Sequence, residues 1–156
     1  ATTHAGNFFD FSVNSEFGSI DNFLYSESNK KQTSYYMLMP KVSIQTQFDR
    51  QLLTLNTSTR HFKYDNFSQD DHSNFSISPR YQYKFSENKT LVIHANYQNL
   101  YQERGTGLSL GNAEALSKGD DIHQANYSLG YLYGSENSVA KTPLTECLSL
   151  EHKAKD

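Results

Sequence analysis

The sequence predicts an all-β fold, an antiparallel up-and-down transmembrane β-barrel of about eight strands, and three observations lead to it. Polar residues alternate with large apolar ones over long stretches, as in strands with one polar and one apolar face. Short connections such as "DRQ" and "SENK" alternate with long ones such as "DNFSQDDHS". Only 36% of the residues are hydrophobic, but that class includes 11 Tyr and 10 Phe, so the chain is too aromatic to be disordered.

Composition also excludes several classes of protein. The net charge is −3 and Lys and Arg are scattered, so the chain has no basic footprint for nucleic acid. Cys147 is the only cysteine, which excludes an internal disulfide and any metal site built from several cysteines. No run approaches the roughly 18 apolar residues of a membrane-spanning helix.

Four strands are expected in the first half of the chain. Asn7–Val13 and Gly18–Ser26 form a first pair, and a polar loop separates them from a strand over Ser34–Phe48. "DRQ" then makes a tight connection to a strand over Leu52–Tyr64. The phase of alternation in that strand slips near Arg60, where we expect either a bulge or an exit from the apolar zone.

The second half predicts three more strands, over Asn74–Phe85, Leu91–Tyr101 and Gln124–Tyr133, each with an aromatic and a polar face. The aromatic faces supply the lipid-facing candidates: Phe75, Ile77, Tyr81, Tyr83, Phe85, Ile93, Tyr97, Tyr127, Leu129 and Tyr131. The polar faces, with the strand before them, supply the candidates for the lumen and for solute contact: Arg60, Arg80, Gln82, Lys84, His94, Asn96, Gln98 and Gln124. Amides and Arg can hydrogen-bond sugar hydroxyls and charged lumen residues tune passage, but the same residues could instead fill a small structural barrel.

A soluble β-sandwich or jelly roll would also show alternation. The inward face of such a fold is usually Val, Leu and Ile, and its connections lack the rhythm of short and long. Tyr and Phe near the strand ends also fit the interfacial girdles of membrane barrels. The pattern therefore favours the membrane barrel over the sandwich.

Several motifs carry a resemblance to a known family. They are the hairpin rhythm, the start of a loop at "YDN", the hairpin "SPRYQYKFSENKTL" and the strand end "YQERGT". In these features the chain, over Asp21–Gly134, resembles bacterial outer-membrane β-barrels of the putative porin type. The resemblance implies a barrel without catalytic residues, and an association with capsule or exopolysaccharide export.

The chain departs from that family at its end. Barrels of this type have more strands and end in an aromatic residue, whereas this chain ends "SVAKTPLTECLSLEHKAKD", where alternation breaks down. We therefore expect barrel strands and loops over residues 1–136 and an irregular tail over 137–156. Either the chain is a fragment of a larger barrel, or its tail is non-native, or it is a small eight-stranded barrel with an unusual end.

No pattern in the sequence predicts a catalytic residue, a cofactor or a metal site. The segment Gly105–Gly111 has the wrong glycine spacing for a dinucleotide site and is expected to be a flexible extracellular loop. Two acidic clusters match no known cation site and are expected to be solvated loops: Asp70, Asp71 and His72, and Asp120, Asp121 and His123.

The expected function is therefore non-enzymatic, the passage or export of a polar solute through the bacterial outer membrane, with polysaccharide suggested by the resemblance. The expected partners are the lipid bilayer with its lipopolysaccharide and the solute, and the oligomeric state stays open. Two alternatives remain. One is a small structural or adhesive barrel without a pore. The other is a soluble secreted carbohydrate-binding β-sandwich that stacks sugars on its Tyr rings.

Overall fold

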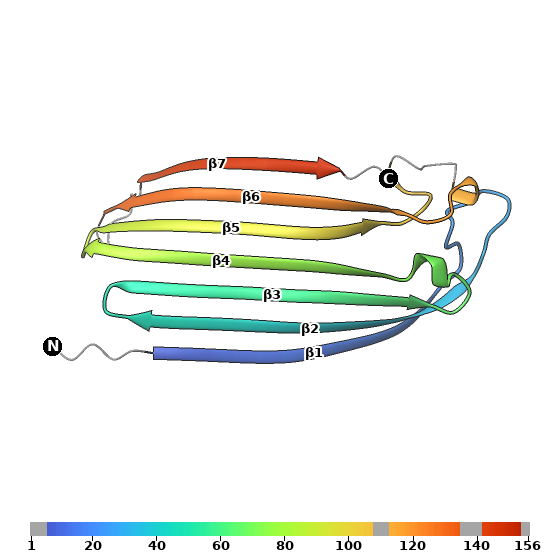
Figure 1. Ribbon diagram of the computed structural model, residues 1–156, viewed down its shortest axis with the longest axis horizontal. Coiled ribbons are helices and arrows are strands. Elements are labelled where there is room, and N and C mark those ends of the chain that lie inside the picture. Colours follow the sequence, from blue (N-terminus) through green and yellow to red (C-terminus); the bar gives the residue numbers. More distant parts are fainter. Residues whose placement is uncertain (1–5, 108–112, 135–141, 154–156) are drawn as a thin grey trace.

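A single antiparallel sheet of seven strands makes up the computed structural model, which describes residues 6–107, 113–134 and 142–153 (Figure 1). In the described connections lie two short 3₁₀ helices, η1 (Ser68–Asp70) and η3 (Ala113–Ala115). The strands are 12 to 16 residues long. They are β1 (Gly6–Ile20), β2 (Thr33–Phe48), β3 (Gln51–Tyr64), β4 (His72–Ser86), β5 (Lys89–Gln102), β6 (Asp120–Tyr133) and β7 (Thr142–Lys153).

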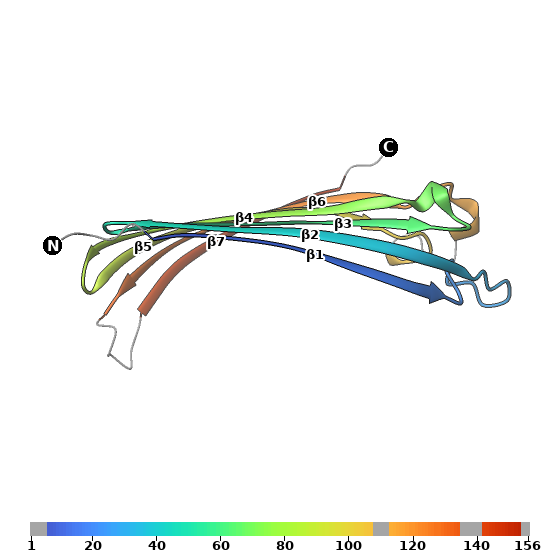
Figure 2. The ribbon, with the colours of Figure 1, turned by 90° about the horizontal axis from the view of Figure 1, so that it is seen from below.

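Each strand pairs with the next one in the chain, so the sheet is a simple up-and-down meander. The turns of the β2–β3 and β4–β5 hairpins lie at one end of the sheet, called here the short-turn end. The connections over residues 21–32 and 65–71 lie at the opposite end, the long-loop end, together with the described parts of the next connection, 103–107 and 113–119 (Figure 1). Figure 2 shows the sheet edge-on as one twisted layer. The predicted up-and-down order and the rhythm of short and long connections are confirmed.

The register sorts the strand residues into two faces, because directly opposed residues point to the same side of a sheet and successive residues to opposite sides. The apolar face carries this row across β3 to β6: Leu53, Tyr81, Ile93 and Leu129. The polar face carries the neighbouring row: Thr54, Arg80, His94 and Ser128.

The first strand differs from the prediction. Gly6–Ile20 is one continuous strand, where a pair of strands was expected. The apolar alternation continues to Phe17, but Ser15 interrupts it in the sequence and hid the continuity. Phe23 and Leu24, expected in a second strand, lie instead in the loop after β1 and are buried.

The end of the chain also differs from the prediction. Thr142–Lys153 forms β7, paired along its length with β6, where irregular chain was expected. Leu144, Leu148 and Leu150 do alternate with polar residues, but Glu146 falls on the apolar positions and obscured the pattern. The predicted boundary between residues 136 and 137 lies outside the described residues.

The slip in phase at Arg60 has no bulge behind it. The register of β3 with β4 runs without a break from Gln51 opposite Tyr83 to Phe62 opposite His72. Phe62 is therefore on the polar face, at the long-loop end, where the sheet stops being polar on that side. The phase slip therefore marks the end of the part of β3 that has one apolar and one polar face. The alternative, a bulge, is not present in β3.

The strands lie in one layer, so the described residues do not form the two packed sheets of a sandwich or jelly roll. The sheet is open, with β1 and β7 at its two edges. The closed barrel of about eight strands therefore stays a prediction.

Candidate functional site

The polar face is the first part of the candidate site. All eight residues expected to contact solute occupy its positions in the register, on β3 to β6: Arg60, Arg80, Gln82, Lys84, His94, Asn96, Gln98 and Gln124. Several stand opposite one another, such as Arg80 opposite His94 and Gln98 opposite Gln124. The strands thus bring together side chains that are far apart in the sequence, and they form a continuous surface of amides, hydroxyls and cations.

Hydrogen bonds between neighbouring strands order this surface. The Ser43 hydroxyl donates to Asn56 Oδ1 at 2.6 Å, and the hydroxyls of Ser58 and Ser76 lie 2.9 Å apart. Ser78 Oγ lies 2.9 Å from His94 Nε2. Such cross-strand pairs hold short polar side chains in place.

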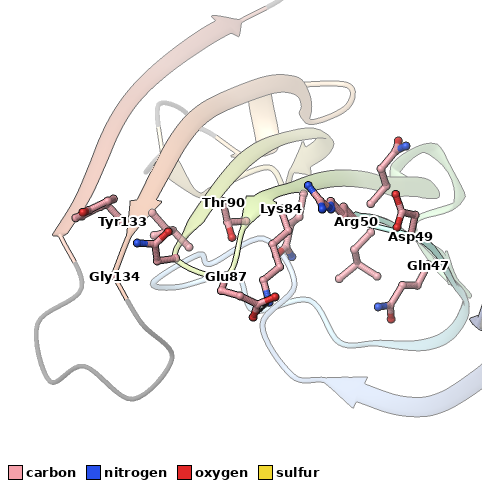
Figure 3. Close-up of a pocket in the computed structure, with 13 residues that line it drawn as sticks. Gln47, Asp49, Arg50, Lys84, Glu87, Thr90, Tyr133 and Gly134 are labelled. Carbon is pink, nitrogen blue, oxygen red and sulfur yellow. Dashed lines mark hydrogen bonds and ion pairs between the residues drawn. The ribbon is translucent and has the colours of Figure 1, made fainter. Parts of the chain in front are cut away.

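Three hollows lined by described residues open on the polar face. Two lie along the strands, one of about 340 Å³ between β1 and β4 and one of about 70 Å³ between β3 and β5. The third, of about 330 Å³, lies at the short-turn end. Figure 3 shows Gln47, Lys84 and Thr90 inside the bend that the strands make there. The polar face is therefore the hollowed side of the sheet.

Four charged residues line the hollow at the short-turn end: Asp49, Arg50, Lys84 and Glu87. Lys84 Nζ lies 3.2 Å from Glu87 Oε2, and Arg50 donates to the carbonyl of Phe85 at 3.0 Å. The remaining polar lining consists mainly of amides and a hydroxyl: Gln47, Gln51, Gln82, Asn88 and Thr90. These amides and the hydroxyl can hydrogen-bond a solute with many hydroxyl groups, because each can both donate and accept.

The apolar face lies on the other side of the same strands and has the opposite chemical character. Fifteen large hydrophobic side chains on β1 to β6 are exposed, and all but Phe8 lie on the apolar face. All ten of the expected lipid-facing residues lie on it, and they include Leu129 and Tyr127, each 51% exposed. An exposed apolar surface of this extent is unusual on a protein that faces only water.

The second part of the candidate site is a folded cap at the long-loop end, which we call the loop cap. It consists of residues 21–32, 65–71, 103–107 and 113–119. Phe23 is its centre, 2% exposed, with its ring 4.7 Å from Tyr64 and 4.6 Å from Phe67. Leu24 and Ala113 complete this buried cluster, and partly buried apolar residues pack against it: Ile20, Tyr35, Phe62 and Phe67.

A buried ion pair joins two of the loops in the cap. Arg104 Nε donates to Asp70 Oδ1 at 2.9 Å, and Arg104 Nη2 donates to Asp70 Oδ2. The side chains are only 6% and 1% exposed, so both charges are out of water. The Tyr101 hydroxyl adds a further bond to Asp70 at 3.1 Å, and Arg104 Nη1 donates to the carbonyl of Leu116 at 2.7 Å.

Glu103 connects the third loop to the first loop and to β3. Its carboxylate accepts hydrogen bonds from the hydroxyls of Tyr64, at 3.1 Å, and Tyr25, at 3.5 Å. Partial burial, and then the charge of Glu103, raise the pKa of the Tyr25 phenol, which keeps it protonated as a donor. A bond of 3.0 Å from the Asn29 amide to Glu114 also joins the first loop to the third.

Sequence reasoning missed the loop cap. Asp70, Asp71 and His72 were expected to be solvated, but Asp70 is buried against Arg104, and Asp71 accepts the backbone N–H of Tyr64 at 2.8 Å. His72 Nδ1 lies 2.9 Å from the carbonyl of Asp70. The available signal was the apolar Phe23, Leu24 and Phe67 inside loops of otherwise polar composition.

The Asp120 cluster and the glycine-rich segment are the other two sites that the sequence singles out. In the Asp120 cluster, His123 Nδ1 lies 3.0 Å from the Tyr97 hydroxyl. The glycine-rich segment lies partly outside the described residues, and its first residue, Gly105, is buried in the cap with φ +81°. Within the described ranges, no three His, Cys, Asp or Glu side chains are grouped to hold a metal ion. None of the described helices is long and apolar enough to cross a membrane.

A one-layer antiparallel meander of long strands, with one apolar face and one hollowed polar face, has the architecture of a β-barrel wall. A family model agrees: the chain belongs to the family described as "Putative beta-barrel porin 2", whose model matches residues 3–132. The resemblance to porin-type barrels expected from the sequence is therefore confirmed. No curated protein and no solved structure matches the chain.

Proposed function

We propose that the chain forms the wall of a non-enzymatic β-barrel in the bacterial outer membrane, through which polar solutes pass. The observation that carries the proposal is the separation of the two faces. Exposed large hydrophobic side chains of β1 to β6 gather on one face, with Phe8 the exception, while the opposite face is hollowed and lined by amides, hydroxyls and Arg. The apolar face meets lipid with its lipopolysaccharide, and the polar face lines water.

Strand length supports this orientation. A strand tilted across a bilayer needs about 9 to 11 residues. The strands here have 12 to 16, so each can cross the hydrocarbon and still extend beyond it. The extra length lies beside the loop cap, where Phe62 and Tyr64 occupy the polar face.

The solute that fits the polar face best is a polyhydroxylated molecule. Gln82, Gln98 and Gln124 offer amide donors and acceptors, and Lys84 and Arg50 already have partners. Amides pair well with hydroxyl groups because each can donate and accept. An oligosaccharide or a polysaccharide segment is the refinement of the proposal that this chemistry favours.

The test is reconstitution of the full chain into liposomes, followed by swelling measurements with uncharged sugars of increasing size. We expect the protein to require detergent or lipid for folding, and to admit small sugars faster than large ones. A monodisperse folded protein in plain buffer would contradict the membrane orientation. An inserted protein that admits no sugar would leave the structural or adhesive barrel as the better description.

A further inference from the structure

The loop cap lies over the polar face and not beside the sheet. Tyr35 and Tyr64 stand opposite each other and continue the polar-face row that Lys41 and Ser58 begin. Tyr64 belongs to the buried cluster around Phe23, so that cluster covers the polar face at the long-loop end. If the polar face lines a channel, as proposed above, the loop cap lies across that channel.

The cap is a folded unit, unlike ordinary solvated loops. Its cluster holds four of the five buried hydrophobic residues described in the structure, although the strands contain most of the chain. Arg104 is also 6.0 Å from the ring centre of Phe67, so the ion pair and the aromatic cluster are continuous. Segments with many buried apolar contacts open less readily than loops with few.

We propose that the loop cap closes the channel at the long-loop end and that the Asp70–Arg104 ion pair is the latch that holds it. Asp70 comes from the second loop and Arg104 from the third, so the pair joins these two loops directly. Arg104 also binds the carbonyls of Ala113 and Leu116, so one guanidinium fixes both its own loop and the neighbouring one. This inference rests on the proposed function.

Asp70→Asn is the variant that tests the latch, because it keeps the size of the side chain and removes its charge. Arg104 would then be a buried cation without its counter-charge, which favours opening of the loop. We expect sugar uptake into liposomes to rise several-fold. Trypsin provides an independent readout, since it should cut after Arg104 only when the loop has opened.

The matched control is Asp121→Asn. It makes the same change from carboxylate to amide at an exposed residue of β6, which lies outside the loop cap and lines none of the three hollows. Uptake and trypsin resistance at Arg104 should stay at their original values. If Asp70→Asn does not insert, Glu103→Ala takes its place, because it releases the third loop from Tyr25 and Tyr64 with a less buried side chain.

The outcomes distinguish a failure of the latch from a failure of the proposed pore. Faster uptake together with cleavage after Arg104 supports the latch. Cleavage after Arg104 with uptake equal to that of the original protein shows that the cap does not close the channel, and protection with unchanged uptake shows that the ion pair is no latch. If the original protein and an opened variant are both inserted and neither admits sugar, the proposed pore fails together with the cap.

Discussion

Single residues on neighbouring positions of one strand give the sharpest test of which face meets lipid. Leu129 lies on the apolar face and is 51% exposed, and Ser128, one residue earlier, lies on the polar face. Leu129→Arg should lower the free energy of unfolding from liposomes by about 2 to 4 kcal/mol if it reaches the bilayer centre, because a cation there is costly. Ser128→Arg should cost much less, since its side chain would enter water.

Urea titration of the two variants in liposomes measures this difference directly. Both carry the same new side chain in the same strand, so any effect of the Arg on strand propensity cancels. An equal loss of stability at the two positions would show that the faces are assigned the wrong way or that neither meets lipid.

Asp70 and Arg104 illustrate at the same scale why a buried ion pair is not by itself a source of stability. Removing two charges from water costs several kcal/mol for each ion, and their attraction offsets this only with good geometry and further hydrogen bonds. Here Tyr101 and the carbonyl of Leu116 provide those bonds. The pair therefore specifies which loops meet. Removing one of its two charges costs far more stability than forming the pair adds, because the other charge is left buried without a partner.

Among the elements, the β2–β3 hairpin contains a strained turn residue. Asp49 has φ +50°, a backbone conformation that Asp and Asn tolerate and that β-branched residues avoid. Asp49→Val should lower the stability of the inserted protein by about 1 to 2 kcal/mol, and Asp49→Asn should leave it nearly unchanged. Heat modifiability on SDS gels would rank the variants, and a Val variant as resistant as the Asn variant would contradict the strain.

The strands could be predicted from the sequence because their side chains alternate with a period of two, and burial on one face imposes that period. The alternation alone, for example, predicts that Ile77, Tyr81, Ile93 and Tyr97 share one face, and the register pairs Ile77 with Tyr97 and Tyr81 with Ile93. β1 was split at Ser15 because one polar residue on an apolar position is enough to hide a continuous strand.

The loop cap could not be predicted in the same way. Asp70 and Arg104 are 34 residues apart, and nothing in local sequence indicates that the two loops carrying them meet. A pair of this kind depends on the register of β3, β4 and β5, which brings the ends of the strands to one edge. Phe23 and Phe67 gave a compositional hint, but not the partner that each would find.

For the whole molecule, strand direction limits how the sheet can close. Strands alternate in direction, so β1 and β7 run the same way (Figure 1). An antiparallel closure therefore needs an odd number of additional strands between these two edges. Lipid cannot satisfy the hydrogen bonds of an open edge, which makes an unpaired β1 untenable in a bilayer.

The backbone of β1 tests this closure. In the described residues β1 pairs only with β2, so alternate N–H groups along Gly6–Ile20 face the open edge. In liposomes we expect these amides to exchange with deuterium as slowly as those of β3, because another strand, from further chain or from a second copy, must pair with them. Rapid exchange at alternate amides of β1, with β3 protected in the same inserted sample, would mean that the edge faces water. The channel would then be open along its side, and the polar face could not be the lining of a closed barrel.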